Sequence, residues 1–374
     1  MARGYATALV GAQFGSEGKG LVAAAMANEF DCHVRTGGPN AGHTFYYDEQ
    51  KFVARSIPIG WINPDATVYI GPGAVIDLDV LGDELNLIEE AGYSIKDRLM
   101  IDERAIIISE AQHLAEGGVA GRAHAQIGST GEGVGLARMA KINRDTLINI
   151  DVAPFACQRV GDDVGLFASI LDTWGDIRVG DVAAELHQKL ASGSKVLLEG
   201  TQGSGLSLTL GSWPHVTSAD TNAAQMASDA GISPSDVSHT VLVARTYPIR
   251  VAGPSGPLYR ETTFEAIGQP EERTTVTQKV RRIGEWNPEQ VRYACEVNHP
   301  ALVVVTFIDY LWPEAKNIVN WRALPEAALE WCEQQEGLIG APIIAVGTGP
   351  NAYCALRSKA GALGLPILKP KVEV

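Results

Sequence analysis

The sequence has few cysteines, no long apolar run and a shortage of basic residues. Its five cysteines form no C-x-x-C pair, so neither a disulfide framework nor a structural zinc site is expected, and a reducing compartment is favoured. No apolar run approaches the ~20 residues that cross a bilayer. The first residues also lack the charged-then-apolar pattern of a leader. We therefore expect a cytoplasmic protein without a membrane partner.

The balance of charge is acidic. The 374 residues include 44 Asp and Glu against 30 Lys and Arg, which gives a formal net charge of −14. A protein that coats nucleic acid normally has a basic face, so nucleic acid is not an expected partner. With 45% hydrophobic and 20% charged residues, the composition is that of a globular protein and not of a disordered, collagenous or coiled-coil chain.

No internal repeat, low-complexity segment or Pro/Ser-rich linker divides the chain. The simplest interpretation is one domain over residues 1–374, although that length exceeds the usual size of a single core. Apolar runs of β type alternate with helical patterns, which is typical of an α/β fold with a large, mostly parallel sheet and helices on both faces. The expected strands are residues 6–10, 67–70, 104–108, 196–198, 240–244, 301–307 and 342–346, and the expected helices include 21–30, 78–91, 183–190, 290–298 and 325–335.

Five glycine-rich or polar loops are candidates for ligand contact: residues 11–20, 36–44, 128–135, 199–205 and 347–350. Open α/β sheets bind their ligands where strands end, so we expect these loops to meet in one crevice. Tight turns would explain the glycines of any one loop, but they are a poor explanation for all five.

The first loop, residues 11–20, resembles a phosphate-binding P-loop without matching its spacing. Gln13 stands where a P-loop has glycine, and Gly20 stands where it has serine or threonine after the lysine. Glycine amides ahead of a helix still make a site for anions, and Lys19 adds a positive charge. The loop is therefore a candidate phosphate site.

The second loop contains Asn40, His43 and Thr44 within five residues. A single histidine is more often structural than catalytic, but one in a glycine loop that buries little favours function. Together the two loops resemble the adenylosuccinate synthetase family, which has a G-x-Q-(W/F)-G-D-E-G-K-G loop and an N-A-G-H-T segment. The resemblance continues in family order through residues 128–135, 199–203, 213–218, 250–251, 276–282 and 347–350.

This resemblance implies the fold of that family, which is related to the P-loop NTPases, and a ligase that forms a C–N bond. In the family, the γ-phosphoryl of a purine triphosphate moves to O6 of a purine monophosphate, and the amine of L-aspartate then displaces phosphate. The resemblance also implies Mg2+ as a cofactor. It further implies a homodimer in which Arg144 reaches the active site of the neighbouring subunit.

The resemblance also assigns residues to roles. The catalytic residues would be Ser16, Lys19, His43 and Gln202; His43 would stabilise the charge between O6 and the γ-phosphoryl, and Gln202 would bond the base at O6. The monophosphate would be bound by Ser16, Asn40, Thr130, Arg144, Gln202, Thr217 and Val251. The triphosphate would be bound by Ser16, Glu17, Gly18, Lys19, Gly20, Gly42, His43, Thr44, Arg281, Phe307, Asp309, Gly347, Gly349 and Pro350. Aspartate would be bound by Val276, Thr277, Gln278, Lys279, Val280, Arg281 and Arg282, and Mg2+ by Ser16 and the Gly42 carbonyl.

Ser16 is the main departure, because the family has an aspartate there that takes the N1 proton of IMP and binds Mg2+. The chain is then a catalytically silent nucleotide-binding relative, an IMP enzyme that tolerates the loss, or an enzyme with another substrate. A silent relative is disfavoured, because the site keeps Lys19, Asn40, His43, Gln202, Thr217 and Arg281. Serine is shorter than aspartate and uncharged, so it leaves room for an amino group at C2 of the base.

The phage-type PurZ branch of the family shows this pattern. That branch uses dGMP and gives N6-succino-2-amino-2′-deoxyadenylate, which leads to 2,6-diaminopurine DNA. We therefore expect dGMP, L-aspartate and a nucleoside triphosphate as partners. A phage-encoded enzyme of this kind would act in the host cytoplasm.

The phosphoryl donor is the second departure. The family reads guanine with a Lys-x-Asp motif at a strand end, and here the residues are Phe307, Ile308 and Asp309. Phe307 either stacks on a purine or is only the last core residue of its strand, whereas Asp309 still suits the donors of guanine. We expect ATP or dATP, with ordinary IMP-and-GTP chemistry as the alternative. Leu21 and Glu132, which replace a common lysine and a common arginine, have no explanation from the sequence.

Overall fold

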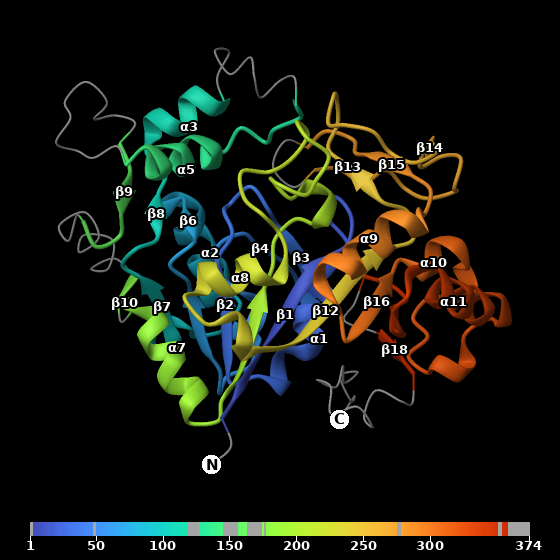
Figure 1. The fold of residues 1–374 in the computed structure, drawn as a ribbon, viewed down its shortest axis with the longest axis horizontal. Helices are drawn as coiled ribbons and strands as arrows, with labels where there is room; N and C mark the ends of the chain where they lie inside the picture. The colour runs from blue at the N-terminus through green and yellow to red at the C-terminus, as the bar shows by residue number, and fades with distance from the viewer. Residues whose placement is uncertain are drawn as a thin grey trace.

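A ten-stranded sheet runs through the centre of the computed structural model, which describes residues 3–47, 50–117, 127–144, 156–162, 174–175, 177–274, 278–350 and 354–357. All neighbouring strands in this sheet are parallel except the last pair, β17 with β18 (Figure 1). In sheet order the strands are β10 (Arg178–Gly180), β7 (Leu99–Asp102), β5 (Thr67–Ile70), β2 (Cys32–Arg35), β11 (Lys195–Glu199), β1 (Tyr5–Gly11), β12 (Val237–Arg245), β16 (Leu302–Thr306), β17 (Ile343–Gly347) and β18 (Cys354–Leu356). The expected large, mostly parallel sheet is confirmed.

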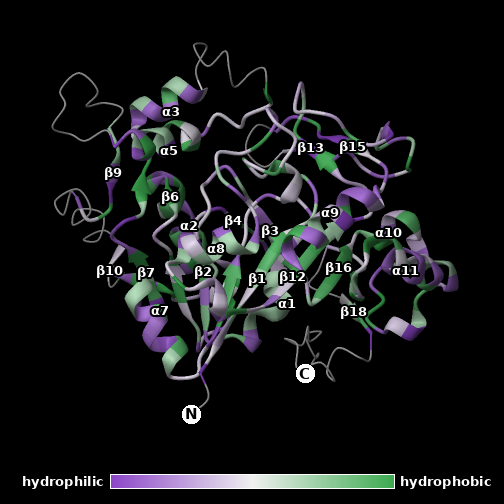
Figure 2. Cartoon of the chain, viewed as in Figure 1, coloured by the Kyte–Doolittle hydropathy of each residue, from purple (hydrophilic) through white to green (hydrophobic). Residues whose placement is uncertain are grey.

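Successive side chains of the central strands pack on opposite faces of the sheet. In β1, Leu9 joins one apolar cluster, whereas Ala8 and Val10 join another. Because both faces are buried, these strands are apolar throughout, as Figure 2 shows for β1, β12 and β16. Helices α1 (Lys19–Met26) and α2 (Leu78–Glu90) cover the first face, and α7 (Val182–Ala191), α8 (Ala223–Ala230), α9 (Pro288–Asn298) and α11 (Glu326–Ile339) cover the second.

The expected helices are present with small shifts at their ends, but one expected strand is not part of the main sheet. Residues 104–108 supply only β8 (Ile106–Ile107), which pairs with β6 (Val75–Ile76) and β9 (Gln158–Arg159). The reason is a turn at the end of β7, where the Asp102 carboxylate accepts a hydrogen bond of 2.8 Å from the Arg104 amide. The chain therefore changes direction before the apolar run begins.

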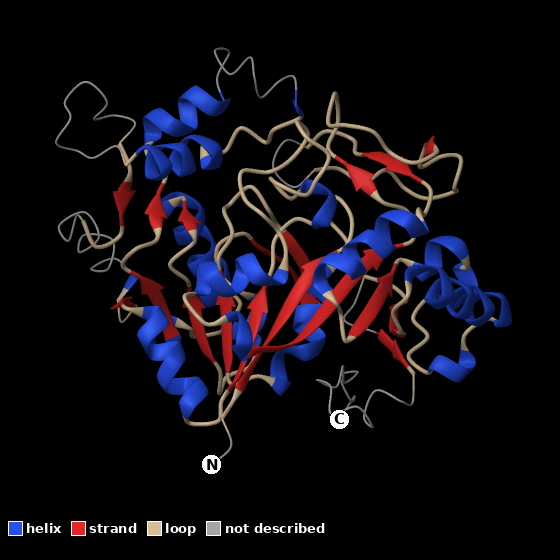
Figure 3. Cartoon of the chain, in the orientation of Figure 1, coloured by secondary structure: helices blue, strands red, loops and turns tan. Residues whose placement is uncertain are grey.

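Smaller elements lie outside the main sheet (Figure 3). They are the hairpin β3 (His43–Tyr47) with β4 (Gln50–Ala54), the antiparallel strands β13 (Ile249–Arg250), β14 (Glu261–Thr262) and β15 (Arg282–Gly284), and the helices α3 (Glu110–Gly117), α5 (Val134–Asn143) and α10 (Ile308–Leu311). Among the described residues, no helix is both long and apolar enough to cross a bilayer.

The carboxyl ends of the central strands bring the predicted loops to one edge of the sheet. The loops 11–20, 36–44, 199–205 and 347–350 follow β1, β2, β11 and β17. The fifth loop, 128–135, differs because it precedes α5 and does not follow a strand of this sheet. Four of the five loops therefore meet as expected for a ligand site in an open α/β sheet.

Candidate active site

The glycine loop after β1 is folded around its own glutamate. The Glu17 carboxylate accepts hydrogen bonds from the amides of Gln13 at 3.0 Å and Gly15 at 2.8 Å, and it pairs with Lys19 at 2.6 Å. Lys19 also donates to the Gln202 carbonyl and is buried. The predicted anion nest is present, but in this structure an internal carboxylate fills part of it. A phosphate must bind elsewhere on the loop or displace Glu17.

A buried charged network lies between the ends of β2 and β11 and the start of β3. The Glu199 carboxylate accepts a hydrogen bond of 2.7 Å from Arg35, lies 2.6 Å from Nδ1 of His43, and accepts the Ile59 amide at 2.8 Å through its other oxygen. Arg35 also donates to the Ala41 carbonyl at 2.7 Å. This network sets the position of the loop that carries Asn40, Gly42 and His43.

The same network sets the protonation of His43. Burial would raise the pKa of Glu199, but hydrogen bonds from His43 and Ile59 and the charge of Arg35 lower it to about 2. Burial, together with the Arg35 charge, lowers the pKa of His43 to about 4 despite Glu199. Two acceptors would repel at 2.6 Å, so Nδ1 carries the proton and donates to Glu199. Nε2 is buried and has no partner among the described residues.

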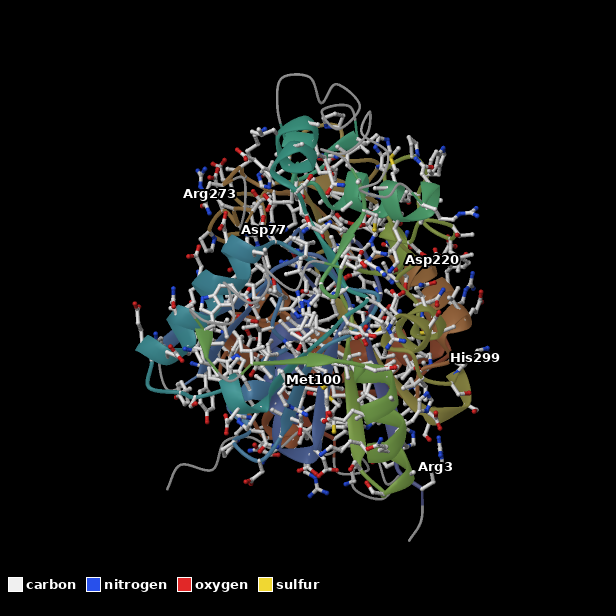
Figure 4. The ribbon with its side chains drawn as sticks, turned by 90° about the vertical axis from the view of Figure 1, so that its left-hand side faces the viewer. Arg3, Asp77, Met100, Asp220, Arg273 and His299 are labelled. Carbon is white, nitrogen blue, oxygen red and sulfur yellow. The ribbon has the colours of Figure 1, made fainter. Side chains whose placement is uncertain are left out.

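A cavity that is open to solvent adjoins this network and brings together several predicted monophosphate ligands. Its walls include Asn40, Gln202 and Thr217, and the Gln202 amide donates to the Asn40 side chain at 3.4 Å. The other lining residues are Thr36, Gly37, Gly38, Val134, Arg138, Gly200, Thr201, Ser218, Ala219, Asp220, Thr221, Met226 and Asp229. Figure 4 labels one of these lining residues, Asp220. The same figure labels Met100 of β7, the strand that packs beside α7.

Four predicted monophosphate ligands do not line the cavity. One of them is Ser16, which lies in the glycine loop after β1. Thr130 is half-buried in the loop before α5, and Val251 lies beside Gly128 of the same loop. Arg144 ends α5 and is exposed.

The structure supplies a physical role for Glu132. Its carboxylate pairs with Arg55, and Arg55 also donates to the Pro39 carbonyl. The pair joins the loop that contains Thr130 to the loop that contains Asn40. Nothing comparable explains Leu21, which packs in the core.

Phe307, predicted to contact the donor base, is half-buried and lies outside both main apolar clusters. It sits between β16 and α10 with φ of 58°. The Arg245 guanidinium covers one face of its ring at 3.9 Å from the centroid, and Tyr310 packs edge-on at 5.0 Å. Only the other face is left for a purine. Burial raises the pKa of the neighbouring Asp309 carboxyl.

The predicted aspartate segment divides into two parts, and its Val276 and Thr277 lie outside the described residues. Arg281 points to the glycine loop and donates to the Ser16 hydroxyl at 2.9 Å. Arg282 points the other way and pairs with Glu261 at 2.6 Å. Of these two arginines, only Arg281 contacts a predicted catalytic residue, Ser16.

Backbone strain marks the same positions. Eight non-glycine residues of the described chain have positive φ, and five of them are predicted site residues: Ser16, Arg144, Gln202, Gln278 and Phe307. Such conformations cost about 1–3 kcal/mol each and cluster at functional sites. Gly18, with φ of 83°, begins α1 in the same left-handed region at no such cost.

Sequence reasoning missed the arginines that organise the site: Arg35, Arg55, Arg138 and Arg245. None of them lies inside a glycine motif. A signal was present for two of them, because Arg35 and Arg245 are charged residues that end the buried strands β2 and β12. A fully buried charge at the carboxyl end of a parallel strand favours a role in the site.

Arg245 connects three parts of the site. It pairs with Glu272 at 2.5 Å and donates to the Ser16 carbonyl at 3.2 Å. The Gln13 side chain bonds both the amide and the carbonyl of Arg245. Arg245 is therefore one buried cation that contacts the glycine loop, the Phe307 ring and the segment before Arg281.

Comparison with known proteins agrees with this geometry. The sequence pattern of the adenylosuccinate synthetase family matches residues 8–157 and 162–313. The adenylosuccinate synthetase of Pyrococcus horikoshii is 34% identical over 348 residues, which are 92% of this chain and 95% of that protein. The adenylosuccinate synthetase of Archaeoglobus fulgidus is 35% identical over 350 residues, which are 92% of this chain and 96% of that protein.

Two solved structures share the fold. The succinoaminodeoxyadenylate synthetase (PurZ) of cyanophage S-2L, bound to dGMP and dATP as an energy donor, is 29% identical with a TM-score of 0.77, and the match covers 98% of this chain and 99% of that one. The fully ligated adenylosuccinate synthetase of Plasmodium falciparum is 23% identical with a TM-score of 0.81, covering 95% of this chain and 100% of that one. The second likeness concerns the fold alone.

The hydrogen bond to Glu199 predicts the tautomer of His43. In the free protein at pH 7 we expect a neutral ring with its proton on Nδ1, observed by nitrogen-15 NMR of labelled histidine. Glu199→Gln removes the anionic acceptor, so a larger share of the Nε2–H tautomer is expected. Glu84→Gln is the control, because Glu84 is buried and bonded to amides of residues 55–57 without touching His43. A wild-type Nε2–H tautomer would contradict this assignment.

Proposed function

Because the chain belongs to the adenylosuccinate synthetase family, a family of C–N ligases, we propose that it condenses dGMP with L-aspartate at the cost of ATP or dATP. The product would be N6-succino-2-amino-2′-deoxyadenylate. The observation that carries this proposal is Ser16, a small neutral residue held by Arg281 at 2.9 Å where the family has an aspartate. The likeness to the cyanophage enzyme bound to dGMP and dATP supports it.

Ser16 accounts for a guanine substrate through size and charge. A serine ends at Oγ, whereas an aspartate would extend a carboxylate beside N1 and C2 of the base. The 2-amino group of guanine is a hydrogen-bond donor that needs the space. Ser16 is also held firmly, because its hydroxyl bonds Arg281 and its carbonyl bonds Arg245. The space is therefore a fixed property of the loop.

The remaining residues suit phosphoryl transfer. O6 of the base would attack the γ-phosphorus as N1 loses its proton to solvent, the bond from the γ-phosphorus to the β-phosphate oxygen would break, and the nucleoside diphosphate would leave. Lys19 would stabilise the charge that develops. His43 is neutral in the free protein, and the anionic γ-phosphoryl beside Nε2 would favour its protonation, so that Nε2 donates to the transferring group while Nδ1 keeps its hydrogen bond to Glu199. The amine of aspartate would then attack C6, and O6 would leave as part of phosphate. Gln202, beside Asn40 in the cavity, would hold the base at O6.

The donor set at the glycine loop fits Mg2+ carried by a nucleotide. The described residues include no cluster of three acidic, histidine or cysteine side chains for a protein-held ion. Ser16 Oγ accepts one hydrogen bond, from Arg281, and keeps a second lone pair. The Gly42 carbonyl would add another neutral oxygen, as Mg2+ sites built largely from phosphates and water need. When bound, Mg2+ neutralises charge on the β- and γ-phosphates.

An adenine donor is favoured by the surroundings of Phe307. The lysine of the family motif is absent, and the cation that covers the Phe307 ring, Arg245, is paired with Glu272. The free ring face offers stacking without a preference for guanine. Asp309 is the feature that favours GTP, so the donor must be measured.

A matrix of substrates tests the proposed function. The purified protein is assayed with dGMP, GMP or IMP, each with aspartate and ATP, dATP or GTP, by following product and phosphate. We expect turnover with dGMP and an adenine triphosphate. Turnover of IMP but not dGMP would show an ordinary synthetase, and no turnover with any pair would show a silent binding protein. GTP efficiency more than tenfold above ATP would mean that Asp309 governs donor choice.

The substitution Ser16→Asp tests directly whether Ser16 selects dGMP over IMP. The added carboxylate should crowd the 2-amino group and shift relative efficiency from dGMP toward IMP by roughly 10- to 200-fold, as expected for one small group in a tight pocket. It should also raise the KM for aspartate, because Arg281 would form an ion pair with the new side chain. Ser16→Ala is the matched control, since it keeps the space and should retain the preference for dGMP. Unchanged use of dGMP by Ser16→Asp would rule Ser16 out as the selector.

The proposed enzyme is a homodimer that shares Arg144. Helix α5 ends at this residue and exposes Met139 and Ile142, two apolar side chains suited to an interface. Neither Arg144→Ala nor His43→Ala should be active alone. Mixed dimers should regain activity, because some of their sites combine an intact His43 with an intact Arg144 of the partner subunit. Dimers confirmed by sedimentation that regain none would contradict sharing.

A further inference from the structure

Arg138 is a cation in the monophosphate cavity to which the family motifs assign no role. It lies on α5 one turn after Val134, and both side chains line the cavity with Asn40 and Thr217. Val134 packs closely on Gly38, where an added Cβ would lie 3.0 Å from it. The same helix face therefore lies against the Gly37–Asn40 turn, which directs Arg138 to the cavity.

The charge of Arg138 is poorly compensated. Among the described residues, Arg138 makes one hydrogen bond, a long one of 3.4 Å that it donates to the Gly73 carbonyl. It forms no ion pair with a described carboxylate, although Asp229 is near enough to act on its charge. Asp229 accepts a bond from Gln225, and Asp220 is bonded by Ser207 and Thr209. Burial lowers the pKa of Arg138, as expected for a cation kept from water without a close anion.

The other cavity donors are neutral. Asn40, Thr201, Gln202 and Thr217 offer amides and hydroxyls, and Arg138 is the one Lys, Arg or His side chain among the lining residues. A phosphate monoester carries close to two negative charges at neutral pH. A guanidinium matches it by two parallel hydrogen bonds, which neutral donors cannot replace.

We propose that Arg138 binds the 5′-phosphate of the purine monophosphate in its own subunit. This inference rests on the proposed function in that the substrate is a nucleoside monophosphate. Arg144 lies six residues later, about 240° around the helix, so one helix serves two sites. Arg138 acts in its own cavity, and Arg144 of the partner subunit approaches from outside.

Equilibrium binding to the intact protein tests this proposal. Affinity for dGMP and for deoxyguanosine is measured by calorimetry with wild type, Arg138→Gln and Arg138→Lys. We expect Arg138→Gln to weaken dGMP by roughly 10- to 100-fold, in the range of a charge-assisted hydrogen bond, and to leave deoxyguanosine unchanged. Arg138→Lys should restore part of the loss. Lys141→Gln, which removes an exposed cation from the same helix, should bind both ligands as wild type does.

The contrary outcomes are distinct. Equal loss of dGMP and deoxyguanosine would show that Arg138 only supports the fold through Gly73, and unchanged dGMP affinity would show that it does not contact phosphate. Parallel titrations with IMP separate this inference from the proposed function. If IMP is the true substrate, the loss caused by Arg138→Gln appears with IMP and the inference stands. If no purine monophosphate binds the wild type, both ideas fail.

Discussion

The arrangement of the site at the carboxyl ends of the central strands depends on the buried carboxylate of Glu199. It ends β11 and is completely enclosed, so both of its oxygens must be hydrogen-bonded. Arg35, His43 and the Ile59 amide satisfy it, and each belongs to a different segment. Removing one partner of such a buried pair typically costs about 3–5 kcal/mol. The position of His43 is therefore set by the same interactions that hold the strand ends together.

A second pair, the buried Arg245 with the partly exposed Glu272, performs the same task on the other side of β1. It supports Phe307 from one ring face and holds the Ser16 carbonyl. The backbone of the segment that leads to Arg281 is tied to it, since the Arg281 amide donates to the Glu272 carbonyl at 2.8 Å. The Arg245–Glu272 pair therefore supports Phe307, Ser16 and the segment that leads to Arg281.

Charge pairing separates the structural cations of the site from those left for ligands. Lys19, Arg35 and Arg245 each have a carboxylate within 2.7 Å. Among the described residues, Arg281 donates to the Ser16 hydroxyl and the Arg273 carbonyl, and Arg138 donates to the Gly73 carbonyl at 3.4 Å; neither forms an ion pair with a described carboxylate. A buried guanidinium without a carboxylate partner is a candidate for binding an anion, although Arg98 and Arg250 are instead satisfied by backbone carbonyls. The substrates proposed for this enzyme carry such anions, since dGMP has a 5′-phosphate and L-aspartate has two carboxylates.

The sequence by itself determined the fold class and the family, because apolar runs, glycine loops and short motifs are local patterns. Glycine-rich loops at the ends of β1, β2, β11 and β17 were predictable from the order of residues alone. Only the tertiary structure decided which charges meet: Glu17 inside its own loop, Ser16 against Arg281, and Glu132 against Arg55. The contacts of Glu17 are local and depend on how its loop folds. The other two contacts join residues far apart in the chain, and their partners follow from strand order and burial, which no local spacing encodes. For the same reason Arg138 was invisible in the sequence, since a helix residue becomes a ligand only when its face is turned to a cavity.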